Sequence, residues 1–341
     1  MKRVVTFGEI MLRLSPPGLE RFFQSPVLSA TFGGGEANVA VSLAHFGLDS
    51  RYVTRVPSNP VGDAALKALR AEGVNVDGVL RGGARLGVYF AETGASQRAG
   101  NVVYDRAGSS ISETAAGTFD WPRLLAGADW LHVTGITPAL GPGVAAATAE
   151  AVESARAAGA RVSLDLNFRR KLWTEAQAQA VLRPLASRAH VVIANEEDLQ
   201  ACLGVPVRAD VRAGEVSAAA YREAAVRVGR DFGAELVAVT LRESFSASRN
   251  GWSAVLWDAN EAAFHEGPRF DVTLVDRIGG GDSFAAGLIF GLVTGRRPVE
   301  ALRFAVAASA LKQTIPGDFN RVTAEEVDRL AGGDASGRVR R

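Results

Sequence analysis

Asp276-Arg277-Ile278-Gly279-Gly280-Gly281-Asp282-Ser283-Phe284-Ala285-Ala286-Gly287 is a run of three glycines and an aspartate that leads into a helix-like series of small residues. Glycines let the backbone approach a phosphate and direct several N–H groups at it, and the first turn of the following helix adds unpaired amides and a positive dipole end. Asp282 beside such an anion cradle could be an ordinary helix N-cap. It could also accept the proton of a hydroxyl group that attacks a phosphoryl group. The stretch alone favours phosphate chemistry, and the simple N-cap role of Asp282 stays an alternative.

Length and charge limit the class of protein. The 341 residues suffice for one large α/β domain, or for a main domain with a small appendage. With 38 basic and 37 acidic residues the net charge is +1, so nothing indicates nucleic acid or a membrane surface as a partner. The N-terminus leads directly into an expected strand without a secretory signal, and no apolar run is long enough to span a bilayer. We therefore expect a cytoplasmic protein.

The cysteine and histidine content argues against disulfides and transition metals. Cys202 is the single cysteine, so no disulfide can form within the chain and a zinc site of four cysteines is excluded. The four histidines, His45, His132, His190 and His265, include no pair at metal-ligand spacing. A transition-metal enzyme is therefore not expected.

Expected strands and helices alternate along most of the chain. The expected strands are residues 4–8, 130–133, 161–166, 190–194 and 236–240. The expected helices are residues 36–46, 63–72, 143–158, 175–186, 196–203, 218–232, 282–294 and 299–314. Asn250-Gly251 is typical of a hairpin turn. This order predicts an α/β fold with a mostly parallel sheet that helices cover on both faces.

Two stretches interrupt this alternation with strand-like sequence and turn residues. They are residues 11–32 and 87–108, and the second contains Val88-Tyr89-Phe90 and Val102-Val103-Tyr104. We expect them to form a small β-sheet lid inserted into one domain of residues 1–335, followed by a tail of residues 336–341. Such a sheet could cover a site at the strand ends. Its open edge also predicts a homo-oligomer that assembles through the lid.

A second glycine loop, Phe32-Gly33-Gly34-Gly35-Glu36-Ala37-Asn38-Val39-Ala40, opens another helix. By itself it is either a plain strand-to-helix turn or a pocket whose amides and Asn38 side chain meet a polar ligand. Two such loops, one near each end of the chain, suggest two ligands held face to face. Together they resemble the two signatures of ribokinase-type (phosphofructokinase-B) sugar kinases, and the resemblance covers roughly residues 4–330.

Within that family the chain is most similar to kinases of 2-keto-3-deoxygluconate. The segments that carry this finer resemblance are Tyr104-Asp105-Arg106, Gly135-Ile136-Thr137-Pro138-Ala139-Leu140 and Ser163-Leu164-Asp165-Leu166-Asn167-Phe168-Arg169. The resemblance implies a three-layer α/β/α ribokinase-like domain with a β-sheet lid, which agrees with the alternation described above. It also implies that ATP, with Mg²⁺, phosphorylates a terminal hydroxyl of the acid sugar to give the 6-phosphate. The resemblance does not decide whether a monovalent cation is also required.

The resemblance also assigns the chemical roles. It makes Asp282 the catalytic base and places the anion hole at Gly279, Gly280 and Gly281. Phosphoryl transfer needs positioning and charge neutralisation more than covalent help, and amides at a helix N-terminus supply fixed positive partial charge. The residues of the first loop that are expected to contact the sugar are Gly34, Gly35 and Asn38.

Two arginines predict an acidic substrate. Arg169 closely follows an expected buried strand, and Arg106 belongs to the expected lid. Ligands of open α/β sheets bind beyond the carboxyl ends of the strands, so both side chains could converge on one ligand. Paired arginines suit a carboxylate, and a neutral sugar would not need them. The alternative is two surface arginines in ordinary salt bridges.

The other expected sugar contacts are Tyr89, Tyr104, Asn167 and Asp318. The two phenol groups suit sugar hydroxyls, although a cross-strand aromatic pair in the lid would have the same sequence. Asn167 is included through the resemblance. Asp318 resembles a family position near the substrate, and it suits a turn aspartate equally well.

Alignment with the family places the nucleotide near Thr240, Arg242, Ala308 and Ser309. Arg242 stands where many relatives have glycine, which puts its contact in doubt. Ala308 and Ser309 also suit close packing between helices, and the sequence does not separate the two roles.

Asn195-Glu196-Glu197-Asp198 resembles the family's Asn-x-x-Glu motif, which helps to place Mg²⁺ through water. The last position is an aspartate here, one methylene shorter, so either the geometry shifts or Glu197 shares the role. The predicted metal residues are Asn195, Glu197 and Asp198, whose oxygen atoms suit Mg²⁺. Acids at a helix start are also normal without a metal.

Three rival functions remain at this point. A fructokinase or ribokinase for a neutral sugar is the nearest, within the same family. An NAD-dependent dehydrogenase would share the alternation of strands and helices, but Gly8-Glu9-Ile10-Met11 after the first strand lacks the dinucleotide fingerprint. A non-catalytic sugar sensor is disfavoured because Asp282 and all three glycines are present.

Overall fold

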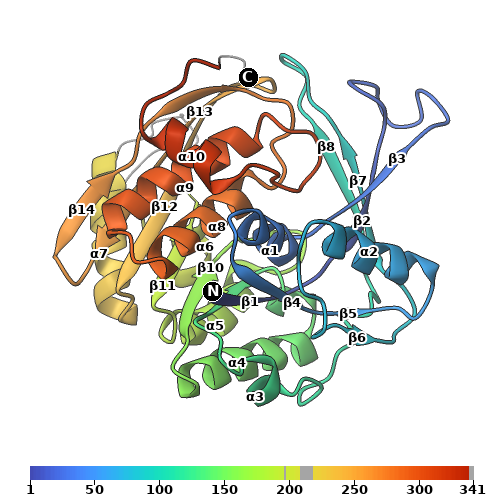
Figure 1. Ribbon diagram of the computed structural model, residues 1–341, viewed down its shortest axis with the longest axis horizontal. Helices are drawn as coiled ribbons and strands as arrows, with labels where there is room; N and C mark the ends of the chain where they lie inside the picture. The colour runs from blue at the N-terminus through green and yellow to red at the C-terminus, as the bar shows by residue number, and fades with distance from the viewer. Residues whose placement is uncertain (196, 208–217, 338–341) are drawn as a thin grey trace.

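The computed structural model describes residues 1–195, 197–207 and 218–337. Within these residues a nine-stranded sheet forms the middle of three layers (Figure 1). Its main path runs in the order β14 (Ala263–Glu266), β13 (Arg249–Asp258), β12 (Leu236–Ser246), β11 (Val191–Ala194), β10 (Arg161–Asp165), β9 (Trp130–Thr134), β1 (Arg3–Phe7) and β4 (Asp49–Val53), and β15 (Phe270–Thr273) also pairs with β13. The strands from β12 to β4 run parallel, whereas β13 is antiparallel to its neighbours. The predicted mostly parallel sheet is confirmed.

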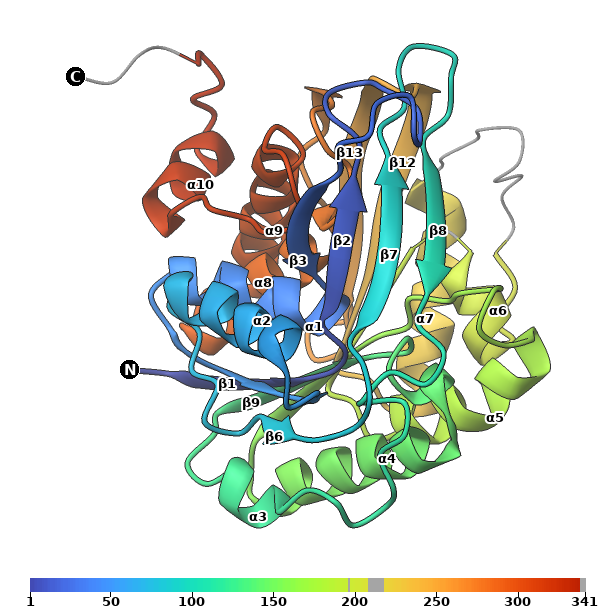
Figure 2. The same cartoon turned by 90° about the vertical axis from the view of Figure 1, so that its right-hand side faces the viewer.

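Helices cover both faces of this sheet (Figure 2). One face carries α1 (Gly35–His45), α8 (Gly280–Val293), α9 (Pro298–Lys312) and α10 (Ala324–Ala331), with α2 (Pro60–Ala71) packed beside α1. The other face carries α3 (Trp121–Leu124), α4 (Pro142–Ala157), α5 (Glu175–Ala186), α6 (Asp198–Leu203) and α7 (Ala218–Phe232). Successive residues of a strand point to opposite faces, so Val4 packs in a cluster with Phe284 and Val5 in a cluster with Leu182. The three-layer α/β/α prediction is confirmed.

A separate four-stranded sheet forms the lid (Figure 2). Its order is β3 (Ser29–Gly33), β2 (Met11–Ser15), β7 (Gly87–Glu92) and β8 (Asn101–Asp105). The central pair, β2 and β7, is parallel, and both outer pairs are antiparallel. Apart from Gly33, these strands lie within the two segments that were expected to form the lid. The remaining short elements are the strands β5 (Arg55–Val56) and β6 (Leu80–Arg81), which form a parallel pair, and the 3₁₀ turn Pro138–Leu140.

Side-chain caps fix the start of several helices. The Thr174 side chain accepts a hydrogen bond from the main-chain N–H of Gln177, and the Gln177 side chain accepts one from Thr174 in return. Asn59 likewise accepts from two amides of α2, whose first residue is Pro60. Such local signals explain why α5 begins where the sequence predicts.

The hairpin between β12 and β13 differs from the expectation. Ser246 of β12 is opposite Arg249 of β13, so the chain turns at residues 247–248. Asn250 and Gly251 lie inside β13, opposite Ser244 and Glu243, and the prediction of a turn at Asn250-Gly251 was wrong. The ladder with β12 and β15 supplies main-chain partners that override the local turn preference. For the same reason β12 continues past residue 240.

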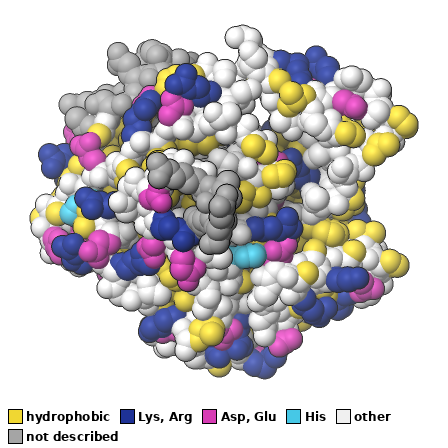
Figure 3. All heavy atoms as spheres, turned by 45° about the horizontal axis from the view of Figure 1, so that its top comes forward, with side chains coloured by type: hydrophobic (Ala, Val, Ile, Leu, Met, Phe, Trp, Pro, Cys, Tyr) yellow, Lys and Arg dark blue, Asp and Glu magenta, His cyan; other side chains and the backbone are white. Residues whose placement is uncertain are grey.

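Charges of both signs are interspersed on the face of the molecule shown in Figure 3. This agrees with the net charge of +1. None of the helices among the described residues has the length and apolar character that a membrane span requires. Residues 338–341 of the expected tail, and Glu196 of the expected helix 196–203, lie outside the described residues.

Candidate active site

A cavity of about 370 Å³ lies between the lid and the carboxyl ends of the parallel strands. It brings together most of the residues that the sequence singled out. Those that line it are Gly34, Gly35, Asn38, Tyr89, Tyr104, Arg106, Asn167, Arg169, Asn195, Asp198, Thr240, Arg242, Gly279, Gly280, Gly281, Asp282 and Asp318. Three predicted residues, Glu197, Ala308 and Ser309, are not part of its lining.

The glycine run shapes one wall of the cavity. Gly279 has φ = 84°, in the left-handed region, and a Cβ atom there would lie 2.2 Å from the main-chain oxygen of Asp318. Helix α8 begins at the next residue, so Asp282 occupies its first turn. Amides of a first helical turn have no partner within the helix. At Gly281 the space beside the backbone is open within 4 Å, which leaves room for a ligand to approach.

Asp282 is held by the other glycine loop. Asn38 Nδ2 donates a 2.7 Å hydrogen bond to Asp282 Oδ2, and Asn38 Oδ1 accepts one of 3.2 Å from the main-chain N–H of Gly34. Burial raises the pKa of Asp282 to about 6, although the hydrogen bond from Asn38 acts in the opposite direction. A carboxyl group with this pKa is ionised at neutral pH and is a stronger base than an exposed aspartate.

The close approach of the first loop to the chain explains its glycines. A Cβ atom on Gly34 would lie 2.0 Å from the main-chain oxygen of Glu9, and one on Gly33 would lie 2.1 Å from Asp318 Oδ2. Larger residues would therefore separate the start of α1 from the segment that joins β1 to β2. The loop can contact the cavity only because these positions carry no side chain.

The two predicted arginines have different surroundings. Arg106 forms a buried ion pair with Glu9, which also accepts a hydrogen bond from Ser109. Arg169 donates to the main-chain oxygen of Phe168 at 3.2 Å, and no carboxylate among the described residues lies within ion-pair distance of it. Arg169 is therefore the more available of the two for an anionic ligand.

The lid tyrosines stack across the strand pair β7–β8. Tyr89 is opposite Tyr104 with ring centroids 5.9 Å apart, and the guanidinium of Arg106 lies 5.5 Å from the Tyr104 ring. Tyr89 and Tyr104 therefore form the cross-strand aromatic pair and also line the cavity. The Tyr89 hydroxyl is 2.7 Å from Asp318, and burial, followed by that carboxylate, raises the pKa of Tyr89, so the phenol is a donor.

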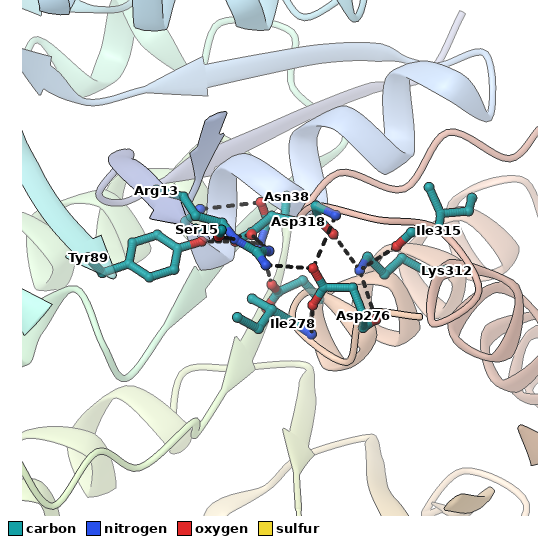
Figure 4. A network of polar contacts seen from close by, with 12 residues as sticks. Arg13, Ser15, Asn38, Tyr89, Asp276, Ile278, Lys312, Ile315 and Asp318 are labelled. Atoms are coloured by element: carbon teal, nitrogen blue, oxygen red, sulfur yellow. Dashed lines mark hydrogen bonds and ion pairs between the residues drawn. The ribbon is translucent and has the colours of Figure 1, made fainter. Parts of the chain in front are cut away.

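A buried network connects the lid to the loops that contain Asp276 and Asp318 (Figure 4). Arg13 of β2 lies 2.6 Å from Asp276 Oδ2 and 2.7 Å from Asp318 Oδ1. Asp318 is 4% exposed and is shared by Arg13 and Tyr89. Asp318 lines the cavity, so it can still contact the sugar as predicted. Its bonds to Arg13 and Tyr89 also connect the lid to the core.

Oxygen-bearing side chains gather at the strand ends on another wall. Asp198 accepts main-chain N–H groups of Phe168 and Asn195 with its two oxygens, at 3.1 and 3.0 Å. Asn195 Oδ1 in turn accepts from the amides of Glu197 and Asp198. The Glu197 side chain is exposed and lies 3.3 Å from Arg170, away from the cavity. The predicted metal residues are therefore only partly brought together, and Glu196 is outside the described residues.

Two cavity residues show unusual local energetics. Burial, followed by the charges of Asp198 and Asp282, raises the pKa of Asp165 well above its usual range. Asn167 has φ = 38°, in the left-handed region that asparagine tolerates better than most residues. Such backbone conformations are concentrated at functional sites.

The predicted nucleotide residues divide into two groups. Thr240 and Arg242, on β12, line the cavity. Ser309 is buried and donates to the main-chain oxygen of Gly280 at 2.6 Å, and Ala308 packs against Gly287 of α8. The described structure thus places Ala308 and Ser309 at the contact between α8 and α9, which is the packing alternative, and a nucleotide role for them stays a prediction.

The sequence analysis did not single out several residues of the site. They are Glu9, Arg13, Glu36, Asp165, Lys312 and Gln313. Glu36 is 1% exposed and accepts hydrogen bonds from Thr134 and Thr137. An acid directly after three glycines, and Asp165 at the end of a buried strand, were visible signals. Glu9 and Arg13 gave none, because their partners are far away in the sequence.

Comparison with known proteins identifies the family. A model described as pfkB family carbohydrate kinase matches residues 1–320. The chain belongs to this family. It is therefore an ATP-dependent carbohydrate kinase, and the predicted ribokinase-like fold is confirmed.

Individual relatives agree with this assignment. A 2-dehydro-3-deoxygluconokinase from Thermotoga maritima has a solved structure that is 47% identical, with a TM-score of 0.94 over 98% of this chain and 100% of that chain. A 2-dehydro-3-deoxygalactonokinase of Haloferax volcanii is 34% identical over 97% of this chain and 98% of its own. A 2-dehydro-3-deoxygluconokinase of Bacillus subtilis is 29% identical over 94% and 93%. The chain is similar to all three over nearly its full length.

Proposed function

We propose that this kinase phosphorylates the terminal hydroxyl of 2-keto-3-deoxygluconate, also called 2-dehydro-3-deoxygluconate, to give the 6-phosphate. The observation that carries the proposal is one cavity that holds both Asp282, on the first turn of α8, and Arg169, an arginine without a carboxylate partner among the described residues. The first suits a hydroxyl that must lose a proton, and the second suits the carboxylate at the other end of the substrate. The names of the relatives support the same acid-sugar class.

The chemistry follows from this arrangement. The Asp282 carboxylate accepts the proton of the sugar hydroxyl, whose oxygen forms a bond to the γ-phosphorus of ATP. The bond between that phosphorus and its bridging oxygen breaks, and ADP leaves with the electron pair. Main-chain amides around Gly280 and Gly281 face the transferring group, where they stabilise its charge without reorganisation. Asn38 keeps the base oriented through its hydrogen bond to Asp282.

Sugar recognition is divided between the core and the lid. We assign the substrate carboxylate to Arg169, with Arg106 as a second contact whose orientation Glu9 maintains. Tyr104 and Asn167 supply polar groups for the sugar hydroxyls, as do Gly34 and Gly35 through their backbone. Tyr89 and Asp318 line the cavity, but they also bond to each other and so offer fewer free positions.

The oxygen donors of the cavity fit Mg²⁺, which ATP-dependent kinases use to neutralise phosphate charge. Asp165, Asn195 and Asp198 would hold it, although main-chain amides already bond to both carboxylate oxygens of Asp198 and to Oδ1 of Asn195. Burial, followed by the charges of Asp198 and Asp282, raises the pKa of Asp165, and a bound cation would offset this concentration of acids. Thr240 and Arg242 lie on the same side and are proposed to face the nucleotide.

Assembly and location remain predictions. The lid ends in β8, whose outer edge has no partner strand among the described residues, and Val103 and Tyr104 there are 46% and 39% exposed. An exposed strand edge with apolar side chains suits pairing with a second copy. Size measurement of the purified protein in solution tests this. We propose a cytoplasmic location, which suits a reaction that consumes ATP.

A substrate panel tests the function. Purified kinase is incubated with ATP and Mg²⁺ together with 2-keto-3-deoxygluconate, its galactonate epimer, fructose or ribose, and ADP formation is followed. We expect the highest kcat/KM with a keto-deoxy acid, and a product with phosphate at the terminal carbon. Equal turnover of fructose or ribose would contradict the acid-sugar proposal and would favour the neutral-sugar kinase instead.

A further inference from the structure

Lys312 is a buried cation that the chemistry described so far does not use. It is the last residue of α9, and its side chain is 0% exposed. Its ammonium group donates to three main-chain oxygens, those of Gly317 at 2.7 Å, Asp276 at 3.2 Å and Ile315 at 3.5 Å (Figure 4). We call these three oxygens the carbonyl cage. A lysine near a helix end often caps its own helix, but none of these oxygens belongs to α9.

The cage joins the two loops that frame the anion hole. Asp276 precedes the glycine run, whereas Ile315 and Gly317 precede Asp318. The Asp276 carboxylate reinforces this connection, because its Oδ2 accepts from the amide of Gly317 at 3.1 Å. A Cβ atom on Gly279 would lie 3.2 Å from Lys312 Cε, so the lysine stem packs directly behind the left-handed turn.

The surrounding charges balance. Arg13 and Lys312 are matched by Asp276 and Asp318, and all four side chains are largely buried. Burial lowers the pKa of Lys312, while the carboxylates of Asp276 and Asp318 act in the opposite direction. Buried charges persist when they are paired and hydrogen-bonded, and the three oxygens match the three donors of an ammonium group.

We propose that Lys312 is a built-in monovalent cation, which keeps the anion hole in shape so that the kinase needs no K⁺ or other free monovalent ion. A set of converging carbonyl oxygens is the kind of environment that replaces the hydration shell of K⁺. Here a covalently attached ammonium group fills it, at no cost in ion binding. In this proposal the open question of a monovalent cation is answered by the protein itself, and Lys312 acts as a positioning residue through the loop Asp276–Gly279.

The test compares ions at constant ionic strength. Kinase activity and thermal unfolding are measured in chlorides of K⁺, NH₄⁺, Na⁺ and tetramethylammonium, for the wild type, Lys312→Met and Lys312→Ala. Lys312→Met keeps most of the apolar stem, whereas Lys312→Ala empties the cage. Lys67→Ala removes an exposed lysine on α2 and is the matched control.

We expect equal wild-type activity in all four salts. Lys312→Ala should lose about 10- to 100-fold in kcat in tetramethylammonium, as for lost hydrogen bonds to a charged group, and K⁺ or NH₄⁺ should restore part of it. The same ions should raise its unfolding temperature, and tetramethylammonium should not. Lys312→Met should stay low in every salt, because its stem blocks the cage, and Lys67→Ala should match the wild type.

Two results would overturn the inference. One is a wild type that requires K⁺ or NH₄⁺, even if both variants fail to fold. The other is a folded Lys312→Ala that responds to no ion in activity or in unfolding temperature. The activity readout rests on the proposed function, whereas the unfolding readout does not. A wrong substrate would therefore leave the ion-specific stabilisation intact, and a wrong cage would remove it.

Discussion

Asn38 Nδ2 lies 2.7 Å from Asp282 Oδ2, and this hydrogen bond joins the two glycine loops across 244 positions of sequence. The same asparagine accepts the amide of Gly34, so its orientation is fixed from both ends. The Asp282 carboxylate is thus oriented by the other glycine loop. In the proposed mechanism, this single contact links binding of the sugar to activation of its hydroxyl.

Removal of the base should separate chemistry from binding. Asp282→Asn keeps the size of the side chain but cannot take up the proton, so we expect kcat to fall by about 100- to 10,000-fold. The KM for the sugar should change little, because Asn38 and Arg169 remain. Steady-state kinetics measure both, with thermal unfolding as the check that the variant folds. Near-normal turnover would show that Asp282 is not the base.

The pH dependence should report the same carboxyl group. Because the base acts when ionised and the pKa of Asp282 is about 6, kcat/KM should fall on the acid side of that value. The slope should approach about tenfold per pH unit. Asn38 stabilises the ionised form, so Asn38→Ala should move this acid limb to higher pH.

The matched control for this experiment is Asn75→Ala, which removes an asparagine that bonds to the exposed Asp77 far from the cavity. Its pH profile should overlay that of the wild type. An acid limb that stays in place in Asn38→Ala would mean that another group governs the profile.

The sequence predicted the architecture well because the patterns that specify it are local. The capping box at Thr174, the apolar face of α4 and the continuous apolar run of α8 are each visible in a short stretch of sequence. The wrong turn at Asn250-Gly251 shows the limit of this reasoning. Its dipeptide favours a turn, but pairing of β13 with β12 and β15 decides the outcome, and that pairing is not local.

The site was predictable to the extent that its residues follow glycine loops or strand ends. Asp282 and Asn38 follow glycine loops, Arg169 follows a strand end, and all three lie in one cavity. The supporting ion pairs were not predictable, because Arg13 bonds to a residue 305 positions away and Glu9 to one 97 positions away. A single sequence carries no sign of such pairings, and only the folded chain brings them together.

Arg169 should determine the preference for an acid. Arg169→Ala should raise the KM for the keto-deoxy acid by about 10- to 100-fold, the cost of losing a charged hydrogen bond. Arg169→Lys should recover only part of this, since lysine cannot grip a carboxylate with two parallel bonds. Arg170→Ala is the control, because that neighbour is exposed and pairs with Glu197. Unchanged KM in Arg169→Ala would place the substrate carboxylate elsewhere.

Glu9 should act on the substrate through Arg106. Glu9→Gln leaves the buried guanidinium with a weaker partner, so we expect the free energy of unfolding to fall by about 1–3 kcal/mol and the sugar KM to rise. Chemical denaturation and steady-state kinetics measure the two effects. Asp105→Asn, which breaks an exposed pair with Arg85, should change stability much less. If the two variants were equally stable, the Glu9–Arg106 pair would contribute no more than a surface pair.

Alanine substitutions at Gly279 and Gly281 should have different effects, the first on stability and the second on ATP kinetics. Gly279→Ala must take up a left-handed conformation and place a methyl group 2.2 Å from a main-chain oxygen, so it should lose at least about 1–2 kcal/mol of stability. Gly281 lies in the first turn of α8 with open space beside it, and alanine is the better helix former there. Gly281→Ala should therefore fold as well as the wild type.

The methyl group of Gly281→Ala would nevertheless stand where the γ-phosphate approaches, and kcat/KM for ATP should fall. Chemical denaturation and ATP kinetics of both variants decide the matter, and normal kinetics in Gly281→Ala would place the phosphate away from this turn.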